Sequence, residues 1–396
     1  MQFKSIYINN FKSLVEFRID LSGFNCLIGM NGCGKSTFLQ FFSFLTQLMR
    51  GNVDQWLNKH KLNILQIPFF KDNKDNEIRF RIEFFREPNQ SVADYWEGVF
   101  SIQHLWTQSE TMQLGNTKFI VENFSERNKR FYSVCKDGQE TLKKTVNFNY
   151  QGSIFSQLAD SDLAEFDEFK NAVRGIQIFG LLTPFFLKQN AKDSHGSIGF
   201  EGENLSAFLH EMDETRHASI TQKLKNVYPH FGDFRTTVLP DLSKELSIIE
   251  NYYEGNRTYT SKARNVNDGL LRILAYLSEN VSEHPILCFD EIENGINPEL
   301  IGFLLKEFTE SNKQIIVTTH SPLILNYLPD SIAVPGVHYF YKTSAGHTQT
   351  IPLFNIPAMR KKLEVMGPGE VYIDTDLMEL SKQAVDMSHN SGKEGA

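Results

Sequence analysis

Residues 29–37 of the chain read Gly29-Met30-Asn31-Gly32-Cys33-Gly34-Lys35-Ser36-Thr37. This stretch fits the pattern G-x-x-x-x-G-K-[ST], in which a glycine-rich loop surrounds the phosphates of a nucleotide. A short apolar run at residues 24–28 precedes it and reads as a buried strand, and a strongly apolar run at residues 38–45 follows it and reads as a helix. A strand, a glycine turn and a helix N-terminus together point unpaired N–H groups at a polyanion. The stretch therefore predicts binding of a nucleoside triphosphate.

The side chains at the end of this loop have separate expected roles. Lys35 should reach the β- and γ-phosphates of ATP, and the Ser36 hydroxyl should bind Mg²⁺. Because Lys35 would lie against the transferred phosphate, we count it among the catalytic residues. The residues expected to contact the nucleotide are Gly29, Asn31, Gly32, Cys33, Gly34, Lys35, Ser36 and Thr37.

The composition is that of an acidic globular protein with room for a large insertion. The chain has 396 residues, of which 41% are hydrophobic and 33 are Phe, enough for a substantial core. The formal net charge of −8 argues against a surface coated in basic residues for nucleic acid, although it leaves a local basic groove open. The four cysteines lack the spacing of a metal site or a disulfide framework. Since no signal segment or apolar run of membrane-spanning length is found, we expect a cytoplasmic protein with no membrane partner.

Two further apolar strands are each predicted to end in polar residues. Residues 286–289 are followed by Asp290 and Glu291, and residues 314–319 are followed by His320. Because residues 286–289 show no polar alternation, we expect a strand buried on both faces of a parallel sheet, whose carboxyl end binds ligands. We expect Asp290 to bind Mg²⁺, Glu291 to act as the catalytic base or to orient water, and His320 to contact the γ-phosphate.

Six short segments, in chain order, carry a resemblance to a known family. They are Tyr7–Ser13, Gly29–Thr37, Gly202–Leu205, Val266–Arg272, Phe289–Gly295 and Thr319–Pro322. This series resembles the ABC-type ATPases of the RecF/SMC/OLD group, and the segment at 202–205 is similar to an element of the stand-alone predicted AAA-family ATPases in that group. Residues 86–195 carry almost no recognisable motif.

The resemblance implies a role for each of the polar residues already singled out. Asp290 corresponds to the Walker B acid, Glu291 to the catalytic carboxylate and His320 to the switch histidine. The signature, which contacts the γ-phosphate held by the opposing subunit, corresponds to Asn267, Asp268 and Gly269. In this signature Asn267 replaces the usual Ser, and its amide can still donate to a phosphate. The residues themselves predict that a helix begins here, with Asn267 or Asp268 as its N-cap. The candidate for the family's Mg²⁺-sensing glutamine is Gln66.

The resemblance also implies a fold and a domain organisation. The expected class is α/β, a P-loop ABC-type ATPase head with a mixed sheet, a flanking antiparallel β-sheet and an inserted helical lobe. Alternating apolar residues at 78–84 predict the antiparallel sheet, and helical spacing within 154–226 predicts the helical lobe. We expect residues 1–85 to form the N-terminal part of the head with the P-loop, and residues 86–260 to form an inserted β-rich and helical lobe for a partner or for regulation. Residues 261–350 should form the C-terminal part of the head, with the signature, Walker B and the switch histidine. Residues 351–396 should form a C-terminal extension whose end we expect to be disordered.

The ABC-type resemblance implies that the chain functions as a dimer. Two chains would pack head to tail and bury two ATP molecules, so that each site joins the loop and carboxylates of one chain to the signature of the other. Small stand-alone members of this group resemble the ATPase components of bacterial anti-phage systems, in which a separate nuclease or toxin does the damage. We therefore expect a homodimer or higher oligomer that hydrolyses ATP and regulates or assembles a protein effector encoded nearby.

Two alternative functions stay open. A RecF-like ATPase for DNA repair or DNA-end binding would need a basic groove, so DNA is a possible partner that the charge does not indicate. An OLD-like nuclease would need a TOPRIM domain, and Asp374 and Asp376 have the Asp-x-Asp shape of its metal site. However, too little chain follows His320 for that domain, and we interpret these two acids as a helix N-cap.

Overall fold

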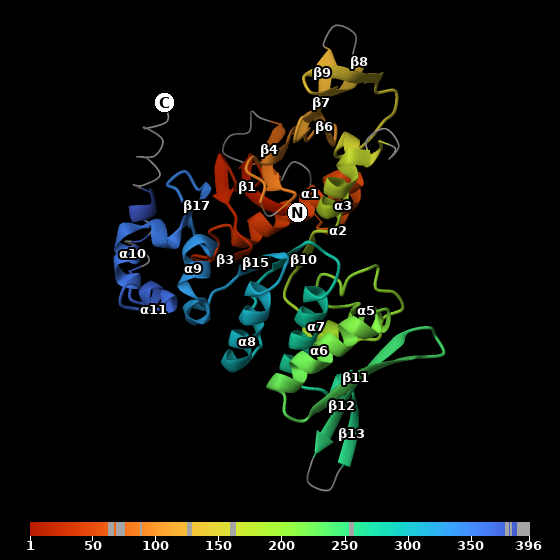
Figure 1. The fold of residues 1–396 in the computed structure, drawn as a ribbon, viewed down its shortest axis with the longest axis vertical. Coiled ribbons are helices and arrows are strands. Elements are labelled where there is room, and N and C mark those ends of the chain that lie inside the picture. The colour runs from red at the N-terminus through yellow and green to blue at the C-terminus, as the bar shows by residue number, and fades with distance from the viewer. Residues whose placement is uncertain are drawn as a thin grey trace. The chain divides into compact units, whose positions relative to one another are not determined.

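The structure of the chain is a computed structural model that describes residues 1–61, 67–68, 76–87, 89–124, 129–158, 164–252, 257–376, 380 and 382–385. Its internal contacts divide the chain into two compact units (Figure 1). The first unit contains Met1–Ile176, Val334–Met366 and Val371–Ala396, and the second contains Gln177–Ala333 and Gly367–Glu370. The second unit therefore consists of one long central segment of the chain and a second segment of four residues near the C-terminus.

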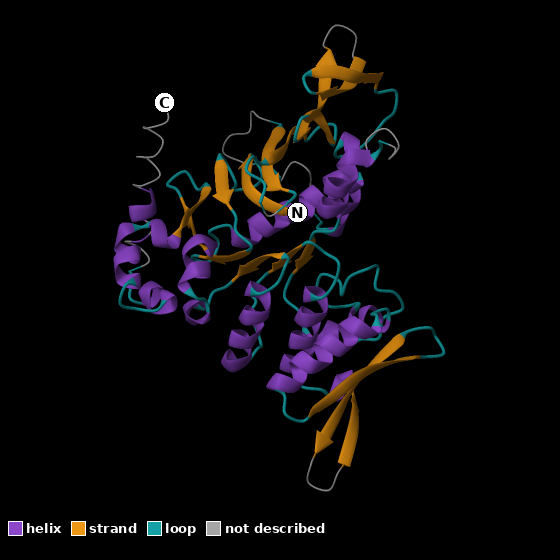
Figure 2. Cartoon of the chain, viewed as in Figure 1, coloured by secondary structure: helices purple, strands orange, loops and turns teal. Residues whose placement is uncertain are grey.

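The first unit contains an eight-stranded antiparallel sheet, drawn with the other strands in orange in Figure 2. Its strands follow the spatial order β2-β1-β4-β5-β6-β7-β8-β9. Their bounds are β1 (Gln2–Asn9), β2 (Phe17–Asp20), β4 (Glu77–Phe85), β5 (Asp94–Ser101), β6 (Trp106–Leu114), β7 (Thr117–Phe124), β8 (Lys129–Lys136) and β9 (Gln139–Thr145). The alternation predicted at residues 78–84 is confirmed, since Ile78, Phe80, Ile82 and Phe84 are all buried.

The helix after the glycine loop packs on the apolar face of this sheet. This helix, α1 (Lys35–Arg50), stacks Phe42 on Phe3 of β1 at a ring-centroid distance of 6.2 Å and meets Phe100 of β5 through Phe44 at 5.2 Å. Burying each such aromatic side chain contributes roughly 1.5–3 kcal/mol. The helix is therefore firmly anchored, and its N-terminus is held in place by the core of the first unit.

A second, smaller group of strands in the first unit delivers the chain to the glycine loop. The five residues of β3 (Phe24–Ile28) are all buried, as predicted, and pair in parallel with β16 (Val337–Lys342). On its other side β16 pairs antiparallel with β17 (Thr348–Pro352). The remaining helices of this unit are α2 (Val53–Lys59), α3 (Asp167–Arg174) and α10 (Pro357–Leu363). Helices α9 (Asp330–Gly336) and α11 (Pro368–Ile373) lie where the chain passes between the units.

The second unit contains three parallel strands, β10 (Gln177–Phe179), β14 (Ile286–Phe289) and β15 (Gln314–Thr318), in that order. The two longer strands are the predicted ones, and all their residues are buried. The strand β10 was not predicted, because it lies inside the region 154–226 that we interpreted as helical. A three-residue strand is too short to show a period of its own, and only its pairing with β14 defines it.

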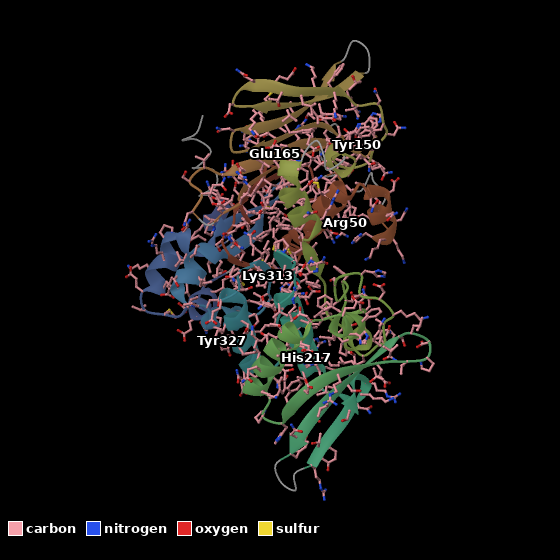
Figure 3. The ribbon with its side chains drawn as sticks, turned by 45° about the vertical axis from the view of Figure 1, so that its right-hand side comes forward. Arg50, Tyr150, Glu165, His217, Lys313 and Tyr327 are labelled. Carbon is pink, nitrogen blue, oxygen red and sulfur yellow. The ribbon has the colours of Figure 1, made fainter. Side chains whose placement is uncertain are left out.

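Helices and a small antiparallel sheet complete the second unit. The helices are α4 (Pro184–Leu187), α5 (Leu205–His210), α6 (Glu214–Val227), α7 (Asp268–Asn280) and α8 (Pro298–Thr309), and the three-stranded sheet is β11 (Phe231–Val238), β12 (Lys244–Tyr252) and β13 (Arg257–Lys262). His217 of α6, labelled in Figure 3, lies on Phe234 of β11 with the rings 4.1 Å apart. The predicted α/β class is confirmed. In the described part of the chain, no helix is long and apolar enough to cross a membrane.

Candidate functional site

The glycine loop has a backbone shape that only glycine allows. Gly29 and Gly34 have φ angles of 139° and 114°, in the region that L side chains rarely adopt. A Cβ atom on Gly29 would lie 2.2 Å from the carbonyl oxygen of Phe340, and one on Gly34 would lie 2.2 Å from Oγ1 of Thr348. These contacts are too short for any side chain, so the loop backbone lies directly against the backbone of β16 and the Thr348 side chain of β17.

Lys35 and the start of α1 supply the positive charge of the loop. The Lys35 side chain is buried, and its Nζ donates to the carbonyl oxygens of Gly29 at 2.8 Å and Met30 at 3.4 Å. Helix α1 has 16 residues, and its N-cap residue is Gly34, which has no side chain to cap the helix. The helix has no acidic residue in its first turn. Its first N–H groups and the positive end of its dipole are therefore available to an anion. The loop fits the phosphates of a nucleotide.

A threonine from β17 supports this loop, and sequence reasoning missed it. The hydroxyl of Thr348 donates to the carbonyl oxygen of Cys33 at 2.7 Å and accepts from Nζ of Lys342 at 2.9 Å. The Ser13 and Thr348 hydroxyls also lie 2.8 Å apart. No motif marks Thr348, because its role depends on the pairing of β16 with β17. Burial raises the pKa of the Cys33 thiol, so Cys33 is a small neutral side chain in the loop.

One hydroxyl in the second unit bonds to both predicted acidic residues, to the carboxylate of Asp290 and to the backbone of Glu291. Asp290 and Glu291 follow β14, and Thr318 is the last residue of β15. The Thr318 hydroxyl donates to Oδ1 of Asp290 at 2.5 Å and accepts from the backbone N–H of Glu291 at 2.8 Å. The Asp290 backbone N–H donates to the carbonyl oxygen of Phe179 in β10, at 2.9 Å. Thr318 is thus a positioning residue for Asp290 and Glu291. The sequence had indicated only that it belongs to an apolar strand.

Glu291 and His320 come together at the ends of these strands. Nε2 of His320 lies 3.6 Å from Oε1 of Glu291, and both side chains are partly exposed, by 39% and 43%. The backbone N–H of His320 donates to Oε1 of Glu293 at 2.7 Å. Glu291 has a left-handed φ of 50°, a strained value for a non-glycine residue that is common at functional sites. A solvent-accessible carboxylate beside an imidazole can accept a proton from water and hold that water in place.

The predicted signature begins helix α7. Oδ1 of Asn267 accepts from the backbone N–H groups of Gly269 at 2.8 Å and Leu270 at 3.2 Å, so the predicted N-cap is confirmed. The amide oxygen is committed to this cap, which leaves Nδ2 as the donor that Asn267 can offer to a phosphate. Asp268 pairs with Nζ of Lys188 at 2.6 Å.

An arginine connects α7 to the turn that follows the carboxylates. Arg272 is buried, and its Nε donates to the carbonyl oxygen of Leu182 at 2.9 Å. Its Nη1 donates to the carbonyl oxygen of Gly295 at 3.0 Å. Gly295 has a φ of 65°, and a Cβ there would lie 1.8 Å from Nη1 of Arg272. The turn after Glu291 and the signature helix are therefore fixed to each other through one side chain.

The predicted site residues divide between the two units. The first unit brings together Gly29 to Thr37, and the second brings together Asp290, Glu291 and His320 and also carries Asn267 to Gly269. Ser36 offers a hydroxyl and Asp290 a carboxylate, the hard oxygen donors that Mg²⁺ takes together with substrate phosphates. Gln66 lies outside the described residues.

The acids near the end of the chain are placed only in part. Oδ2 of Asp374, which directly follows α11, lies 3.0 Å from Nζ of Lys362 in α10. The predicted helix after Asp376 covers residues 377–380. Residues 377–379 lie outside the described part of the chain, and the backbone N–H of Leu380 donates to the carbonyl oxygen of Asp376 at 2.9 Å. Among the described residues no group of three or more His, Cys, Asp and Glu side chains is placed to hold a metal ion.

Two solved structures resemble the whole fold at low sequence identity. The SMC head bound to the C-winged helix domain of ScpA aligns with a TM-score of 0.53 and 13% identity, over 89% of this chain and 98% of that one. The SMC head domain with an extended coiled coil, bound to the C-terminal domain of ScpA derived from Pyrococcus furiosus, aligns with a TM-score of 0.50 and 12% identity, over 92% and 99%. At this identity the likeness shows an SMC-head fold and nothing more.

Two family profiles match the sequence itself. Residues 1–178 match the family described as "AAA ATPase domain", and residues 118–326 match the family described as "AAA domain, putative AbiEii toxin, Type IV TA system". The search of curated proteins found no match. The second profile spans more than half of the 396 residues. The chain has the fold of an SMC head. By the profile match it belongs to this AAA-domain family and is an ATPase, an enzyme that hydrolyses ATP.

Proposed function

We propose that this ATPase forms a head-to-tail dimer around ATP and uses ATP hydrolysis to regulate or assemble a separate protein effector in the bacterial cytoplasm. The observation that carries the proposal lies at the ends of β14 and β15. There the Thr318 hydroxyl bonds to Asp290 and to the N–H of Glu291, and the Glu291 side chain lies beside His320. Carboxylates at the carboxyl ends of buried parallel strands occupy the ligand-binding edge of an α/β sheet.

In the proposed site, the phosphate loop supplies binding and the second unit supplies hydrolysis. Lys35 and the N-terminus of α1 would bind the phosphates, and Mg²⁺, held by Ser36 and Asp290, would neutralise their charge. Glu291 would orient a water molecule and accept its proton as the water oxygen attacks the γ-phosphorus. The bond from that phosphorus to the bridging oxygen then breaks, and ADP and phosphate leave.

The partner subunit would complete the site through its signature. Its Asn267, Asp268 and Gly269 would lie against the γ-phosphate, with the Asn267 amide as a donor. A phosphate at this place would compete with the Asn267 oxygen for the N–H of Gly269, since this N–H donates to Asn267 in the helix cap. Binding of ATP would therefore favour the dimer, and loss of the γ-phosphate would release it.

The Glu291→Gln variant tests the proposal most directly. The amide cannot accept the proton, so ATP turnover should fall by about 10²–10⁴-fold, the usual contribution of a positioned base. Because the nucleotide is not consumed, the variant should accumulate as an ATP-bound dimer, measured by light scattering after gel filtration. The matched control is Glu310→Gln, which changes an exposed carboxylate at the end of α8. An unchanged rate of phosphate release in Glu291→Gln would refute the assignment.

The effector role has support of a different kind. The description of the matched family names a putative toxin of a Type IV TA system, which supports a role in defence beside a partner protein. The SMC heads that this fold resembles are described as bound to domains of ScpA, a separate protein. We place the partner surface on residues 86–260, since the other parts of the head carry the nucleotide motifs.

A RecF-like role in DNA binding is the second candidate, and an OLD-like nuclease is the third. We favour neither, because the net charge of −8 offers no obvious DNA surface and because Asp374, the first acid of the Asp-x-Asp pattern, pairs with Lys362. Binding to a DNA duplex with free ends should be measured with and without ATP at two salt concentrations. ATP-dependent binding that weakens steeply with salt would favour the RecF-like role over the effector role.

A further inference from the structure

A group of large apolar side chains is exposed on the second unit. Leu181, Phe185 and Phe200 are exposed by 40%, 70% and 45%, and we call these three residues the apolar patch. Phe200 lies on the backbone of Gly180, the residue before Leu181. The N–H of Gly180 donates to the Phe200 carbonyl oxygen at 2.8 Å, and a Cβ on Gly180 would lie 2.6 Å from the Phe200 ring. Exposed clusters of this kind mark interaction surfaces.

Two contacts tie the apolar patch to the signature helix. Lys188, directly after α4, pairs with Asp268 in the first turn of α7 at 2.6 Å. Nε of Arg272, also in α7, donates to the carbonyl oxygen of Leu182 at 2.9 Å. The segment that carries Leu181 and Phe185 is therefore fixed beside the start of α7. The apolar patch thus belongs to a segment that contacts the signature helix directly.

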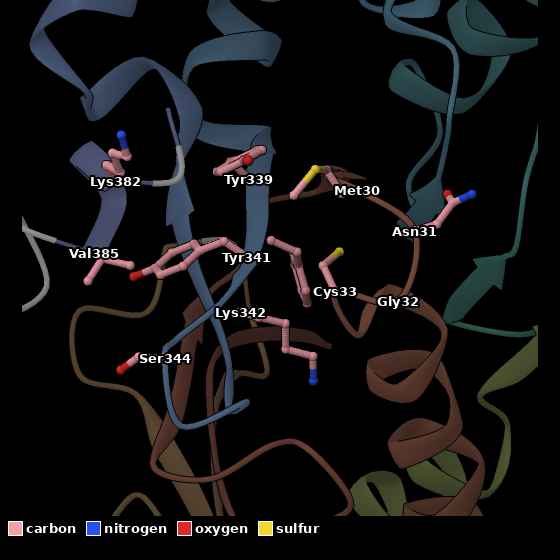
Figure 4. Close-up of a pocket in the computed structure, with 11 residues that line it drawn as sticks. Met30, Asn31, Gly32, Cys33, Tyr339, Tyr341, Lys342, Ser344, Lys382 and Val385 are labelled. Atoms are coloured by element: carbon pink, nitrogen blue, oxygen red, sulfur yellow. The ribbon is translucent and has the colours of Figure 1, made fainter. Parts of the chain in front are cut away.

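The first unit has a largely apolar cavity of ≈ 570 Å³ beside the phosphate loop (Figure 4). Met30 of the loop lines it and is 45% exposed, and the predicted nucleotide contacts at residues 31–33 line it too. The buried rings of Tyr339 and Tyr341 from β16 form another part of its wall. Val385 lines the opposite side. The Tyr341 hydroxyl donates to the carbonyl oxygen of Ala384 at 3.2 Å, which holds that side in place. The cavity thus has fixed walls and lies directly against a nucleotide-binding element.

We propose that Phe185 of one copy of this chain inserts into the cavity beside the phosphate loop of a second copy. This inference rests on the proposed function, because a head-to-tail dimer is what brings the signature of one chain to the loop of the other. An aromatic side chain buries roughly 150–250 Å² when it becomes an anchor of this kind. The cavity, with a volume of ≈ 570 Å³, has room for the Phe185 ring.

The charges around the two surfaces are complementary. Lys342 and Lys382 line the cavity. The apolar patch is flanked by Glu201 and Glu203, which lie one and three residues after Phe200 and are half-buried. The cavity thus has positive charges at its edge and the apolar patch has negative ones. An apolar centre with complementary charges around it is typical of a specific protein interface, and these charges favour a second copy of the chain over an uncharged ligand.

The direct test is a crosslink between two differently tagged preparations, both in the Glu291→Gln background. One carries Phe185→Cys and the other carries Val385→Cys, and a short bismaleimide joins them in the presence of ATP. Only a contact between copies yields a product with both tags. We expect at least about tenfold more of it than from a control pair with Val238→Cys, because proximity raises the effective concentration of the two thiols. Val238 is 50% exposed on β11 of the same unit. Equal yields from the two pairs would overturn the proposal.

An equilibrium measurement uses variants that leave the nucleotide contacts intact. Phe185→Ala should weaken ATP-dependent dimerisation about 10- to 100-fold, as expected for an aromatic anchor, while Val238→Ala should not. Val385→Trp fills the cavity from its own side and should weaken the dimer likewise. If Val385→Trp instead weakens ATP binding to the monomer, the cavity holds the nucleobase and the proposal is wrong.

These outcomes separate the inference from the proposed function. If Glu291→Gln forms no dimer with ATP, the proposed function itself fails. If Glu291→Gln forms a dimer and Phe185→Ala dimerises as tightly as Val238→Ala, only the inserted phenylalanine is disproved.

Discussion

The phosphate loop of the first unit and the carboxylate site of the second are held in place by different means. The loop takes its shape from its own backbone, with positive φ angles at its glycines and Lys35 bonded to the carbonyl oxygens of Gly29 and Met30. Asp290 and Glu291 are instead positioned by Thr318, which lies 28 residues further along the chain than Asp290. The loop is therefore a local structure with outside support, whereas the carboxylate site exists only where β14 and β15 lie side by side.

This difference has consequences for mutation. A local structure fails when its backbone conformation becomes impossible, and the failure should appear in folding and in nucleotide binding together. A site held by one hydroxyl can lose its geometry while the fold and the nucleotide contacts remain. The first two of the following predictions test this distinction and the third tests a buried acid of the second unit, in order of decreasing expected effect.

Gly29→Ala should break the loop. Its Cβ would lie 2.2 Å from the Phe340 carbonyl oxygen, at a φ of 139°, so we expect a destabilisation of about 3 kcal/mol or more and at least a 100-fold loss of ATP affinity. The matched control is Gly32→Ala, whose Cβ would meet nothing within 4 Å at a φ of 75° and should cost only about 1 kcal/mol. Thermal unfolding and titration with a fluorescent nucleotide measure both. Equal losses in the two variants would show that contact with β16 does not shape the loop.

Thr318→Val should impair hydrolysis selectively. Valine keeps the shape of the buried side chain but removes the hydroxyl that bonds Asp290 and Glu291. A hydrogen bond to a charged group contributes about 1.5–3 kcal/mol, so kcat should fall by about 10- to 100-fold. The dissociation constant of ATP should change by less than about threefold, because Lys35 and α1 are untouched. Thr318→Ser retains the hydroxyl and should recover most of kcat. Equal rates in the Val and Ser variants would remove Thr318 from the site.

Glu279 of α7 should make the stability of the second unit depend on pH. Its Oε1 accepts from the Ser197 hydroxyl and from the N–H of Ile198, and its buried Oε2 lies 3.9 Å from Nε2 of His284. Burial raises the pKa of Glu279 to about 7, so the folded state keeps a proton that the unfolded state releases near pH 4.5. The free energy of unfolding should therefore fall as pH rises from 5 to 7, by up to about 3 kcal/mol.

The Glu279→Gln variant isolates this effect. It keeps the acceptor for Ser197 and Ile198 but cannot ionise, so its melting temperature should change less than that of the parent chain between pH 5 and pH 8. The range should stop there, because burial lowers the pKa of the neighbouring Lys313, labelled in Figure 3, to about 8. A parallel pH dependence in variant and parent would assign the effect to other groups.

Sequence reasoning recovered the local parts of this protein well. The motif at 29–37 predicted the strand, the loop and the helix, and the apolar run before Asp290 predicted the buried strand β14. The N-cap at Asn267 was also readable, because a capping side chain and the N–H groups it accepts from lie within three residues. Each of these features depends on neighbours in the chain, and hence on a pattern that a short window contains.

The residues that hold the loop and the carboxylate site in place could not be predicted from the sequence. Thr348 contacts Cys33 across 315 positions, Arg272 contacts Leu182 across 90, and β10 is a strand only because β14 lies beside it. A threonine at the end of an apolar strand has no special neighbours in sequence, so nothing distinguishes Thr318 from other buried threonines until the sheet is formed.

The sequence by itself thus determined the α/β class, the nucleotide loop and the acids and histidine that end the core strands, because each follows from glycine conformation, apolar periodicity or helix capping. Tertiary structure alone decided which hydroxyls hold the loop and the carboxylates, that Glu291 meets His320, and where an apolar patch and a cavity stay open. Those arrangements depend on which distant segments pack together, and the physical information for that lies in the whole core.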